Sequence, residues 1–293
     1  MDWRAGYIAV DWGTTNRRAY LIGGDGGLVH KLADDHGVRA VAKGRYPDEV
    51  ALIRQRLGDL PMLIAGTVGS ARGWQAAPYV ECPATINQLA SAIDWAEPGR
   101  TGIIPGVCQR GSEPDVMRGE EVQALGAVLS GLAPPTGLIC HPGTHAKWIR
   151  MEPARIAGFR TAMTGEMFNL LREHSTLSEM LSGQVSDDQA FRAGVRQGLE
   201  GSDLLSSLFG IRPRNLLGEP GGQNAAFASG LLIGSDVRVA LQRDHPPQVT
   251  LVGEPELCTL YRTALELAGC PSKTVPGDTA YLAGVAAVVE RLP

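Results

Sequence analysis

The amino-acid sequence predicts an α/β protein of two related lobes, each with a mixed sheet flanked by helices. One observation is a repeated plan: strand, Gly-Thr turn, strand, turn, strand opens the chain and returns from residue 138. The other is that each such meander is followed by strand and helix segments, which is typical of α/β folds. A length of 293 residues also suits two domains better than a single core.

The first lobe is expected to open as an antiparallel meander. Its second turn contains Asp25-Gly26, a pair that suits the positive φ of a hairpin turn. The last helix of this lobe is expected to be amphipathic. Its apolar stripe would carry Val122, Leu125, Leu129 and Leu132. The expected elements are strands at 7–12, 17–23, 28–33 and 62–66, a strand and turn within 101–107, helices at 47–58 and 119–132, and a glycine-rich loop at 68–74.

A stretch rich in Pro and Gly, 133–137, predicts the junction to the second lobe. After it, the sequence predicts a second meander, a mostly helical region, and a strand–helix unit with Gly269 as the helix C-cap. We expect lobes of residues 1–134 and 135–276, with the final helix, 277–293, rejoining the first lobe. The expected elements are strands at 138–141, 145–151 and 155–161, a loop at 216–225, helices at 226–241 and 277–292, and a strand and helix within 248–270.

The composition argues for a small-molecule partner. Lys and Arg number 27 against 31 Asp and Glu, and no basic run suggests binding to nucleic acid. The N-terminus does not have the pattern of a signal peptide, and no apolar run reaches membrane-spanning length. The five cysteines are scattered without a C-x-x-C pair, which disfavours disulfide and zinc frameworks. We therefore expect a cytoplasmic protein with reduced thiols and with no nucleic-acid or membrane partner.

The turn Gly13-Thr14-Thr15-Asn16 in the first hairpin has the composition of a phosphate-binding loop. Glycine lets a phosphate approach the backbone, and threonine hydroxyls add hydrogen-bond donors. Asp11, just before the turn, would repel a bare phosphate, but it suits a hydrated Mg²⁺ that lies between the two. A plain hairpin with polar turn residues is the alternative.

The matching turn of the second meander, residues 141–145, reads HPGTH. Two such turns, one in each lobe, could hold a polyphosphate from both sides. Lys147 could then lie near phosphate, or it could be a solvated strand residue. His141 and His145 are four residues apart, a spacing that shares a face only on a helix. Because Pro-Gly disfavours a helix between them, we do not expect a metal site at these histidines.

A third motif, Arg118-Gly119-Glu120-Glu121, opens a predicted helix. Acidic residues at a helix N-terminus are favoured by the helix dipole, which is a purely structural explanation. The functional alternative is a general base that accepts the proton of a hydroxyl attacking phosphorus. Gly253, between a strand and a helix, would let an adenine approach the backbone, or would serve an ordinary strand–helix turn. The sequence contains no P-loop, no dinucleotide-binding glycine motif and no nucleophile elbow.

These motifs, with others spread over the whole chain, resemble the 2-dehydro-3-deoxygalactonokinase family of the actin, Hsp70 and sugar-kinase superfamily. The resemblance implies two ribonuclease H-like lobes of the actin-like ATPase fold that close on their substrates. It also implies ATP-dependent phosphorylation of the 6-hydroxyl of 2-dehydro-3-deoxy-D-galactonate in galactonate catabolism. The matching stretches are YIAVDWGTTNRRAYL (7–21), AGTVGSARGWQAAPY (65–79), IIPGV (103–107), DVMRGEEVQALGA (115–127), HPGTHAKW (141–148), FRTAMTGE (159–166), FASGLLIG (227–234) and PGDTAYLAG (276–284).

The resemblance also implies roles for individual residues. Asp11 would position Mg²⁺, and Glu120 or Glu121 would be the catalytic acid–base residue, with Glu120 slightly favoured. His141 stands where many members of the superfamily carry Asp, which puts metal binding by the second turn in doubt. The nucleotide would be held by Gly13, Thr14, Thr15, Gly143, Thr144, Lys147 and Gly253, and the sugar acid by Asn16, Arg18, Ser70, Trp74 and Arg118.

Other functions remain open on the sequence. One is an exopolyphosphatase-like or nucleotide phosphatase, in which water replaces the sugar hydroxyl, and another is a different sugar or sugar-acid kinase of the same superfamily. A non-catalytic sugar-acid sensor should carry a DNA-binding appendage, and an actin-like ATPase module should polymerise with nucleotide. The epimer of the sugar acid and the oligomeric state, for which a homodimer is one option, are left open.

Overall fold

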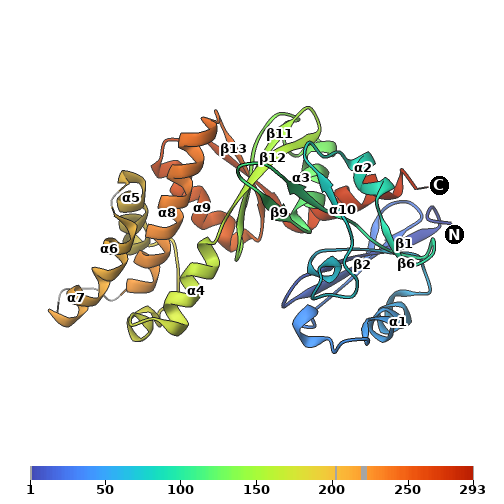
Figure 1. The fold of residues 1–293 in the computed structure, drawn as a ribbon, viewed down its shortest axis with the longest axis horizontal. Helices are drawn as coiled ribbons and strands as arrows, with labels where there is room; N and C mark the ends of the chain where they lie inside the picture. Colours follow the sequence, from blue (N-terminus) through green and yellow to red (C-terminus); the bar gives the residue numbers. More distant parts are fainter. Residues whose placement is uncertain (1, 202, 219–222, 293) are drawn as a thin grey trace. The chain divides into compact units, whose positions relative to one another are not determined.

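The computed structural model describes residues 2–201, 203–218 and 223–292. Its contacts divide the chain into two compact units (Figure 1). The first unit comprises Met1–Thr136, Met151–Phe159 and Asp278–Pro293, and the second comprises Gly137–Arg150 and Arg160–Gly277. Both units combine helices with mixed β-sheets, so the predicted α/β class is confirmed.

The first unit contains a six-stranded sheet in the order β3-β2-β1-β4-β7-β6. The first three strands form the expected antiparallel meander, while β4 and β7 extend the sheet in parallel to β1. A helix, α1, covers this sheet through a core that includes Ile8, Val50 and Ile64. The elements are β1 (Gly6–Trp12), β2 (Arg17–Gly23), β3 (Leu28–Asp34), α1 (Tyr46–Leu57), β4 (Met62–Ala65), β6 (Asp94–Glu97) and β7 (Thr101–Ile103).

The strand and turn expected within 101–107 are present, as β7 and the turn after it, but the segment also contains the start of a second strand, β8, in a different sheet. Gly106 packs so tightly there that a Cβ on it would lie 2.6 Å from the carbonyl oxygen of Met117. One expectation for this unit was wrong. The helix expected at 119–132 ends at Leu129, which is 39% exposed and so does not belong to the buried stripe. The further elements are η1 (Val38–Ala40), η2 (Thr67–Gly69), β5 (Tyr79–Glu81), α2 (Ile86–Ser91), β8 (Gly106–Gln109), β9 (Asp115–Met117), α3 (Glu120–Leu129) and α10 (Gly277–Val289).

The second unit contains most of a five-stranded sheet in the order β12-β11-β10-β13-β14, of which the segment Met151–Phe159 is assigned to the first unit. Helices α5 and α8 lie side by side in this unit (Figure 1). They approach so closely that a Cβ on Gly194 or Gly230 would lie 2.1 Å from a backbone oxygen of the other helix, so only glycine fits. The elements are β10 (Gly137–His141), β11 (Ala146–Glu152), β12 (Arg155–Ala162), α5 (Gln189–Glu200), α8 (Asn224–Asp244), β13 (Val249–Gly253), α9 (Pro255–Leu267) and β14 (Ser272–Pro276).

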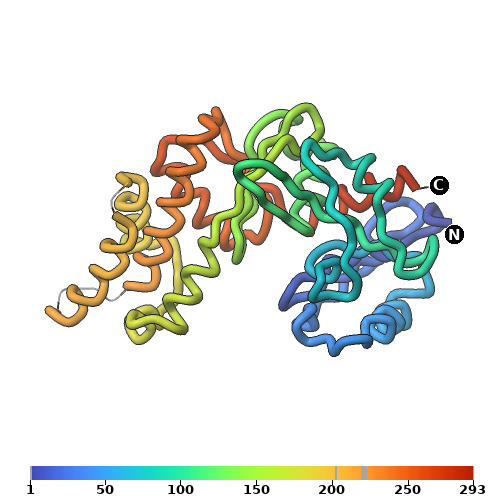
Figure 2. Tube along the Cα trace, viewed as in Figure 1, coloured from blue at the N-terminus to red at the C-terminus, as the bar shows by residue number. Residues whose placement is uncertain are grey.

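The stretch after residue 163 is helical, as expected, and packs beside α8 (Figure 2). A small apolar cluster that includes Leu181, Leu208 and Leu231 joins these helices to α8. The loop expected at 216–225 lies partly outside the described residues. No helix in the described parts of the chain has the length and hydropathy needed to cross a membrane. The elements are α4 (Thr164–His174), η3 (Ser178–Leu181), α6 (Leu204–Phe209) and α7 (Ile211–Leu216).

Candidate active site

The first phosphate turn, Gly13–Asn16, closes the hairpin between β1 and β2. The N–H of Gly13 donates to the carbonyl of Asn16 at 2.9 Å. The segment 37–39 lies against the turn, and its three N–H groups donate to the three carbonyls of residues 13–15 at 3.0 to 3.1 Å. A Cβ on Gly37 would lie 2.4 Å from the carbonyl carbon of Thr15. Only glycine therefore fits where the segment crosses the turn.

This pairing determines the direction of the N–H groups in the turn. In a trans peptide, the C=O of one residue and the N–H of the next point in opposite directions. Because the carbonyls of residues 13–15 face the segment 37–39, the N–H groups of residues 14–16 face away from it. Successive N–H donors on one side of a turn form the concave surface that binds phosphate.

The turn also contacts η2 through a hydroxyl pair. The Oγ1 atoms of Thr14 and Thr67 are 3.1 Å apart, within hydrogen-bond distance. Gly66, just before η2, has a φ of 103°, and a Cβ there would lie 2.7 Å from the carbonyl oxygen of Trp12. A Cβ on Gly119 would in turn lie 3.2 Å from the Cα of Gly66. These close contacts bring the acidic motif next to the end of β1, where Asp11 lies.

Asp11 and Arg18 are direct partners in the register of β1 and β2. Their side chains form an ion pair with 3.6 Å between Arg18 Nη1 and Asp11 Oδ2. Burial, and then the charges of neighbours that include Asp11 and Glu121, raise the pKa of Tyr281 well above its ordinary value. The predicted magnesium ligand and the predicted acid–base motif thus lie around the same tyrosine.

The two neighbouring acids of the third motif have different environments. Glu121 is fully buried, and both of its carboxylate oxygens accept the N–H of Gly119, at 2.8 and 2.7 Å. Burial, together with the charge of Glu120, raises the pKa of Glu121 to about 8. Glu120 is only half-buried, and its Oε2 accepts the N–H of Arg118 at 3.1 Å. Glu120 is therefore the more accessible of the two acids.

Two of the residues predicted to bind the sugar acid lie together. The Nη1 of Arg118 packs against Gly69, next to Ser70, and would lie 2.8 Å from a Cβ at that glycine. Its Nη2 donates to the carbonyl of Ala77 at 2.8 Å, and the guanidinium lies over the ring of Tyr79. Its Nε and Nη1 are buried and have no hydrogen-bond partner among the described residues.

Trp74, which is also predicted to bind the sugar acid, packs against aromatic residues of the first unit. Its ring stacks on Tyr46 at 6.2 Å between centroids with 8° between the planes, and Tyr46 packs in turn against Trp12. Trp74 contacts the core cluster of the first unit. This contact explains the tryptophan by packing alone, and its predicted role in binding substrate stays a prediction.

In the second unit, the matching turn packs against the N-terminus of α4. A Cβ on Gly165 would lie 2.6 Å from the carbonyl oxygen of Gly143, and the N–H of Glu166 donates to the carbonyl of Thr144 at 2.9 Å. The Nε2 of His145 is 2.7 Å from Glu166 Oε2. The positive end of the α4 dipole therefore lies beside this turn, which favours a bound anion there.

The two other residues predicted from this region occupy different positions. Lys147 lies on β11, is 6% exposed, and donates to Thr161 Oγ1 on β12 at 2.8 Å. It is not a solvated strand residue. Gly253 ends β13 with a φ of 149°, and a Cβ there would lie 3.7 Å from the carbonyl oxygen of Pro142, which precedes the turn.

Gly143 and Thr144 open onto a cavity of about 240 Å³ that lies wholly within the second unit. Its walls are mostly apolar and include Leu232 and Leu257, with hydroxyls from Ser229 and others as polar groups. Such a lining, apolar with a few polar groups, is typical of small-molecule sites. The remaining lining residues are Thr164, Gly165, Phe168, Asn169, Val185, Ile233, Leu260 and Tyr261.

The buried carboxylate of Asp236, on α8, forms hydrogen bonds with two of the side chains that line this cavity. Asp236 accepts Thr164 Oγ1 at 3.1 Å and the Tyr261 hydroxyl at 3.0 Å, both on Oδ2. Its Oδ1 accepts Trp148 Nε1 at 3.0 Å and Arg160 Nη2 at 2.7 Å. The carboxylate thus joins β11, β12, α4 and α9, and fixes the two hydroxyl-bearing side chains at the cavity.

The residues that support the turns were not predicted from the sequence. Thr67, the segment 37–39 and Asp236 all act through contacts between segments far apart in the chain. The glycines at 37 and 66 were the available signal, but a lone glycine has many explanations. Within the described residues, no group of three or more His, Cys, Asp or Glu side chains is arranged to hold a metal ion.

The chain matches the model of the family described as 2-keto-3-deoxy-galactonokinase over residues 11–288. It is 38% identical to the 2-dehydro-3-deoxygalactonokinase of Escherichia coli K12, over 98% of this chain and 99% of that protein. A crystal structure from Sinorhizobium meliloti, provisionally described as a 2-dehydro-3-deoxygalactonokinase, is 36% identical and covers 97% of this chain and 98% of its own, with a TM-score of 0.90.

A more distant structure shares the fold. Component A of the (R)-2-hydroxyglutaryl-CoA dehydratase of Acidaminococcus fermentans is 12% identical, covers 98% of both chains, and has a TM-score of 0.54. The predicted actin-like ATPase fold is thereby confirmed. The family model and the identity to the Escherichia coli protein both extend over nearly the whole sequence, and the chain belongs to the 2-keto-3-deoxy-galactonokinase family.

Proposed function

We propose that this protein transfers the γ-phosphoryl group of ATP to the 6-hydroxyl of 2-dehydro-3-deoxy-D-galactonate. The observation that carries the proposal is the 38% identity to the Escherichia coli enzyme of that name over 98% of the chain. The turn at 13–16, with three N–H groups on one side, supports a phosphorylated co-substrate. Phosphoryl transfer requires positioning and charge neutralisation rather than a covalent intermediate, and no nucleophile motif is needed.

The phosphates of ATP are proposed to bind at both turns. The N–H groups of residues 14–16 and the Thr14 hydroxyl hold the terminal phosphates, while Gly143 and Thr144 hold phosphate next to the N-terminus of α4. The apolar cavity that opens from the second turn takes the adenine. Gly253 and Lys147 stay predicted contributors, with Lys147 acting through the position of β11 because its ammonium is already bonded to Thr161.

The residues present fit a magnesium ion that arrives with ATP. Mg²⁺ keeps most of its waters and takes one or two carboxylates and phosphate oxygens, so it does not require a cage of three protein ligands. Asp11 is the carboxylate at the end of β1 beside the turn, and we propose that it holds the ion. When bound, Mg²⁺ would neutralise charge on the transferred group. The family's use of ATP supports this assignment.

Glu120 is the proposed general base. A base must reach the substrate hydroxyl and be ionised at neutral pH. Glu121 meets neither condition, since it is fully buried and its pKa is raised to about 8. Glu120 is half-buried, and the N–H of Arg118 holds its carboxylate. We assign to Glu121 the separate task of fixing Gly119, so that Glu120 is presented at the start of α3.

The sugar-acid carboxylate is proposed to bind at Arg118. Two nitrogens of this guanidinium, Nε and Nη1, are buried without a partner among the described residues, which is costly, and a guanidinium matches a carboxylate in geometry. Ser70, which follows Gly69 in the chain, and Asn16 and Arg18, on the first hairpin, are proposed to contact the hydroxyls. A cytoplasmic location and a homodimer stay predictions from the sequence.

Coupled ADP release tests the function. The purified protein is assayed with ATP, Mg²⁺ and each of three acceptors: 2-dehydro-3-deoxy-D-galactonate, its gluconate-derived epimer, and a simple hexose. We expect ADP release that depends on the galactonate-derived acid, with a phosphate at C6 of the product by phosphorus NMR. ATP loss at the same rate without an acceptor would instead indicate a phosphatase, and preference for another acceptor would identify a different kinase.

A further inference from the structure

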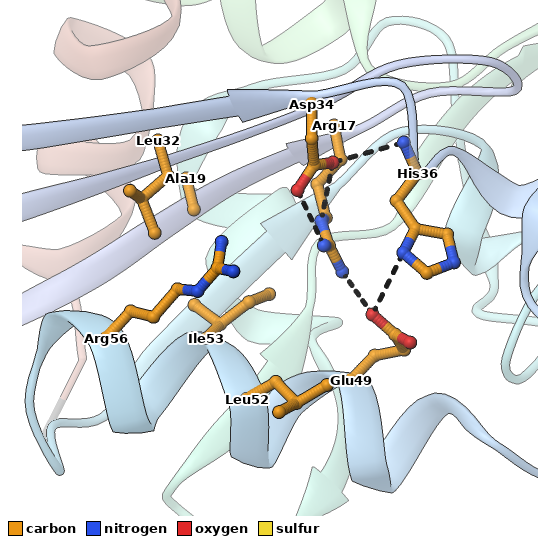
Figure 3. Close-up of a pocket in the computed structure, with 9 residues that line it drawn as sticks. All are labelled: Arg17, Ala19, Leu32, Asp34, His36, Glu49, Leu52, Ile53 and Arg56. Atoms are coloured by element: carbon orange, nitrogen blue, oxygen red, sulfur yellow. Dashed lines mark hydrogen bonds and ion pairs between the residues drawn. The ribbon is translucent and has the colours of Figure 1, made fainter.

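A cluster of charged side chains lies behind the segment that crosses the first phosphate turn. Figure 3 shows the guanidinium of Arg17, on β2, between Asp34 of β3 and Glu49 of α1. Its Nε and Nη2 donate to the two carboxylate oxygens of Asp34 at 3.1 and 2.8 Å, and its Nη1 donates to Glu49 Oε2 at 2.7 Å. Arg17 is only 7% exposed, so its planar fork is held on both sides in a single geometry.

Arg17 touches the two groups that hold the peptides on either side of His36. One is Asp34, whose Oδ1 accepts the N–H of His36 at 3.1 Å. The other is Trp12, whose ring lies 4.9 Å from the guanidinium carbon and whose Nε1 donates to the carbonyl of His36 at 3.0 Å. Both backbone groups of His36 are therefore bonded to side chains that Arg17 contacts.

Directly after His36 come the three residues whose N–H groups donate hydrogen bonds to the turn. The N–H groups of residues 37–39 bind the carbonyls of residues 13–15, and this pairing directs the N–H groups of residues 14–16 away from the segment. A shift at residue 36 would therefore rotate the peptides whose N–H groups face away from the segment. The contact cannot be relaxed by sliding, because Gly37 already lies against the backbone of Thr14 and Thr15.

We propose that Arg17 is a positioning residue that holds the segment 36–39 against the first phosphate turn and thereby sets the affinity for ATP. The proposal rests on the function proposed above, since it takes ATP as the ligand of the turn. Arg17 itself does not contact the nucleotide. It acts through Asp34 and Trp12 on His36, and through the segment 37–39 on the turn.

The chain offers a matched control in the same unit. Arg54, on α1 like Glu49, is 8% exposed and donates to Glu97 at 2.7 Å and to Thr101 at 2.6 Å. It is as buried and as well paired as Arg17, but its partners lie at β6 and β7, away from the turn. Arg17→Lys and Arg54→Lys each keep the positive charge and lose the planar guanidinium. The two variants therefore differ chiefly in which residues the guanidinium holds in the wild type.

The experiment compares wild type, R17K and R54K by calorimetric titration with ATP, by KM for each substrate, and by thermal unfolding. We expect R17K to raise the Kd and KM for ATP by about tenfold, since small displacements at a positioned site are costly. Its KM for the sugar acid should change by less than about twofold. R54K should lose thermal stability without changing the affinity for ATP. Equal ATP affinities in R17K and wild type, or equal losses in R17K and R54K, would overturn the proposal.

Hydrogen exchange gives a second reading that does not require catalysis. The amides of residues 37–39 should exchange faster in R17K than in wild type, and at the wild-type rate in R54K. If R17K does not fold, E49Q takes its place, because it keeps the Asp34 pair and weakens the contacts of Glu49 Oε2 with Arg17 Nη1 and, at 3.6 Å, with His36 Nδ1. A wild type that binds ATP but transfers no phosphoryl group would refute the proposed function and leave this comparison intact. Unchanged exchange at residues 37–39 in both R17K and E49Q would refute the positioning role alone.

Discussion

The backbone N–H of Gly119 donates to both carboxylate oxygens of Glu121, at 2.8 and 2.7 Å, inside a fully buried site. This bond holds a glycine with a φ of 109° at the start of α3. It leaves Glu120, one residue earlier in the helix, half-buried and within reach of bound molecules. One of two adjacent glutamates is thus part of the fold, and the other is available for chemistry.

Glu120→Gln is predicted to slow phosphoryl transfer. The amide cannot accept the proton of the attacking hydroxyl, and general-base catalysis is worth about 10²- to 10⁴-fold. We expect kcat to fall by about 10²-fold or more, with the melting temperature close to that of wild type because Glu120 is partly exposed. Single-turnover rates measure this directly. A variant as fast as wild type would place the base elsewhere.

Glu121→Gln is predicted to change how stability depends on pH. The carboxyl has an ordinary pKa of 4.5 in the unfolded chain and about 8 in the folded protein. At pH values between these two, the folded protein binds more protons than the unfolded chain does. The free energy of unfolding of wild type therefore falls as the pH rises from 4.5 to 8. The pKa difference corresponds to at most about 5 kcal/mol.

Chemical denaturation of wild type and E121Q at pH 5 and pH 8 measures this effect. Glutamine keeps an oxygen that accepts the N–H of Gly119 but does not ionise. We therefore expect E121Q to gain stability relative to wild type at the higher pH. Parallel pH profiles for the two proteins would show that Glu121 does not titrate in this range.

Gly37→Ala is predicted to displace the first phosphate turn. The φ of Gly37 is −69°, which alanine adopts without strain, so the substitution acts only through its new methyl group. That methyl would lie 2.4 to 2.6 Å from backbone atoms of Thr14 and Thr15. We expect the KM for ATP to rise by about tenfold or more. Gly183→Ala, where the nearest neighbour is 3.9 Å away, is the control and should bind ATP as wild type does.

Asp236→Asn is predicted to weaken both the second unit and its nucleotide site. The substitution leaves Arg160 without its carboxylate partner and places an NH₂ group where donors now point. Breaking a buried ion pair costs about 3 to 5 kcal/mol. Because Thr164 and Tyr261 line the cavity, the KM for ATP should rise while the KM for the sugar acid stays near that of wild type. Thermal unfolding and steady-state kinetics measure the two effects, and a change confined to the sugar acid would contradict the assignment of this cavity to ATP.

Much of the fold could be predicted because its signals are local. The three opening strands follow apolar runs and turn residues, and the turn at 13–16 is readable from its glycine and threonines. The strand β8 was not predicted, because the periodicity of an apolar run does not show that a second short strand begins after the turn and joins a different sheet. Leu129 was assigned to the buried stripe because the sequence does not show where α3 ends.

The supports of the site could not be predicted for a similar reason. Asp236 is one acidic residue in a long helix, and its four partners come from β11, β12, α4 and α9. Arg17 looks like any polar strand residue until β3 and α1 place acids on both sides of it. The distinction between Glu120 and Glu121 depends on burial, which follows from how α3 packs.

The measurement that tests the central claim most directly is sugar-acid-dependent ADP release by wild type and Asp11→Asn across a range of Mg²⁺ concentrations. The claim is that the first turn binds the phosphates of ATP and that Asp11 holds the Mg²⁺ that accompanies those phosphates. We expect acceptor-dependent release by wild type that saturates with Mg²⁺. For D11N we expect a kcat lower by about 10²-fold and a higher Mg²⁺ requirement, with unchanged unfolding. Release by D11N at the wild-type rate and with the wild-type Mg²⁺ dependence would contradict the claim.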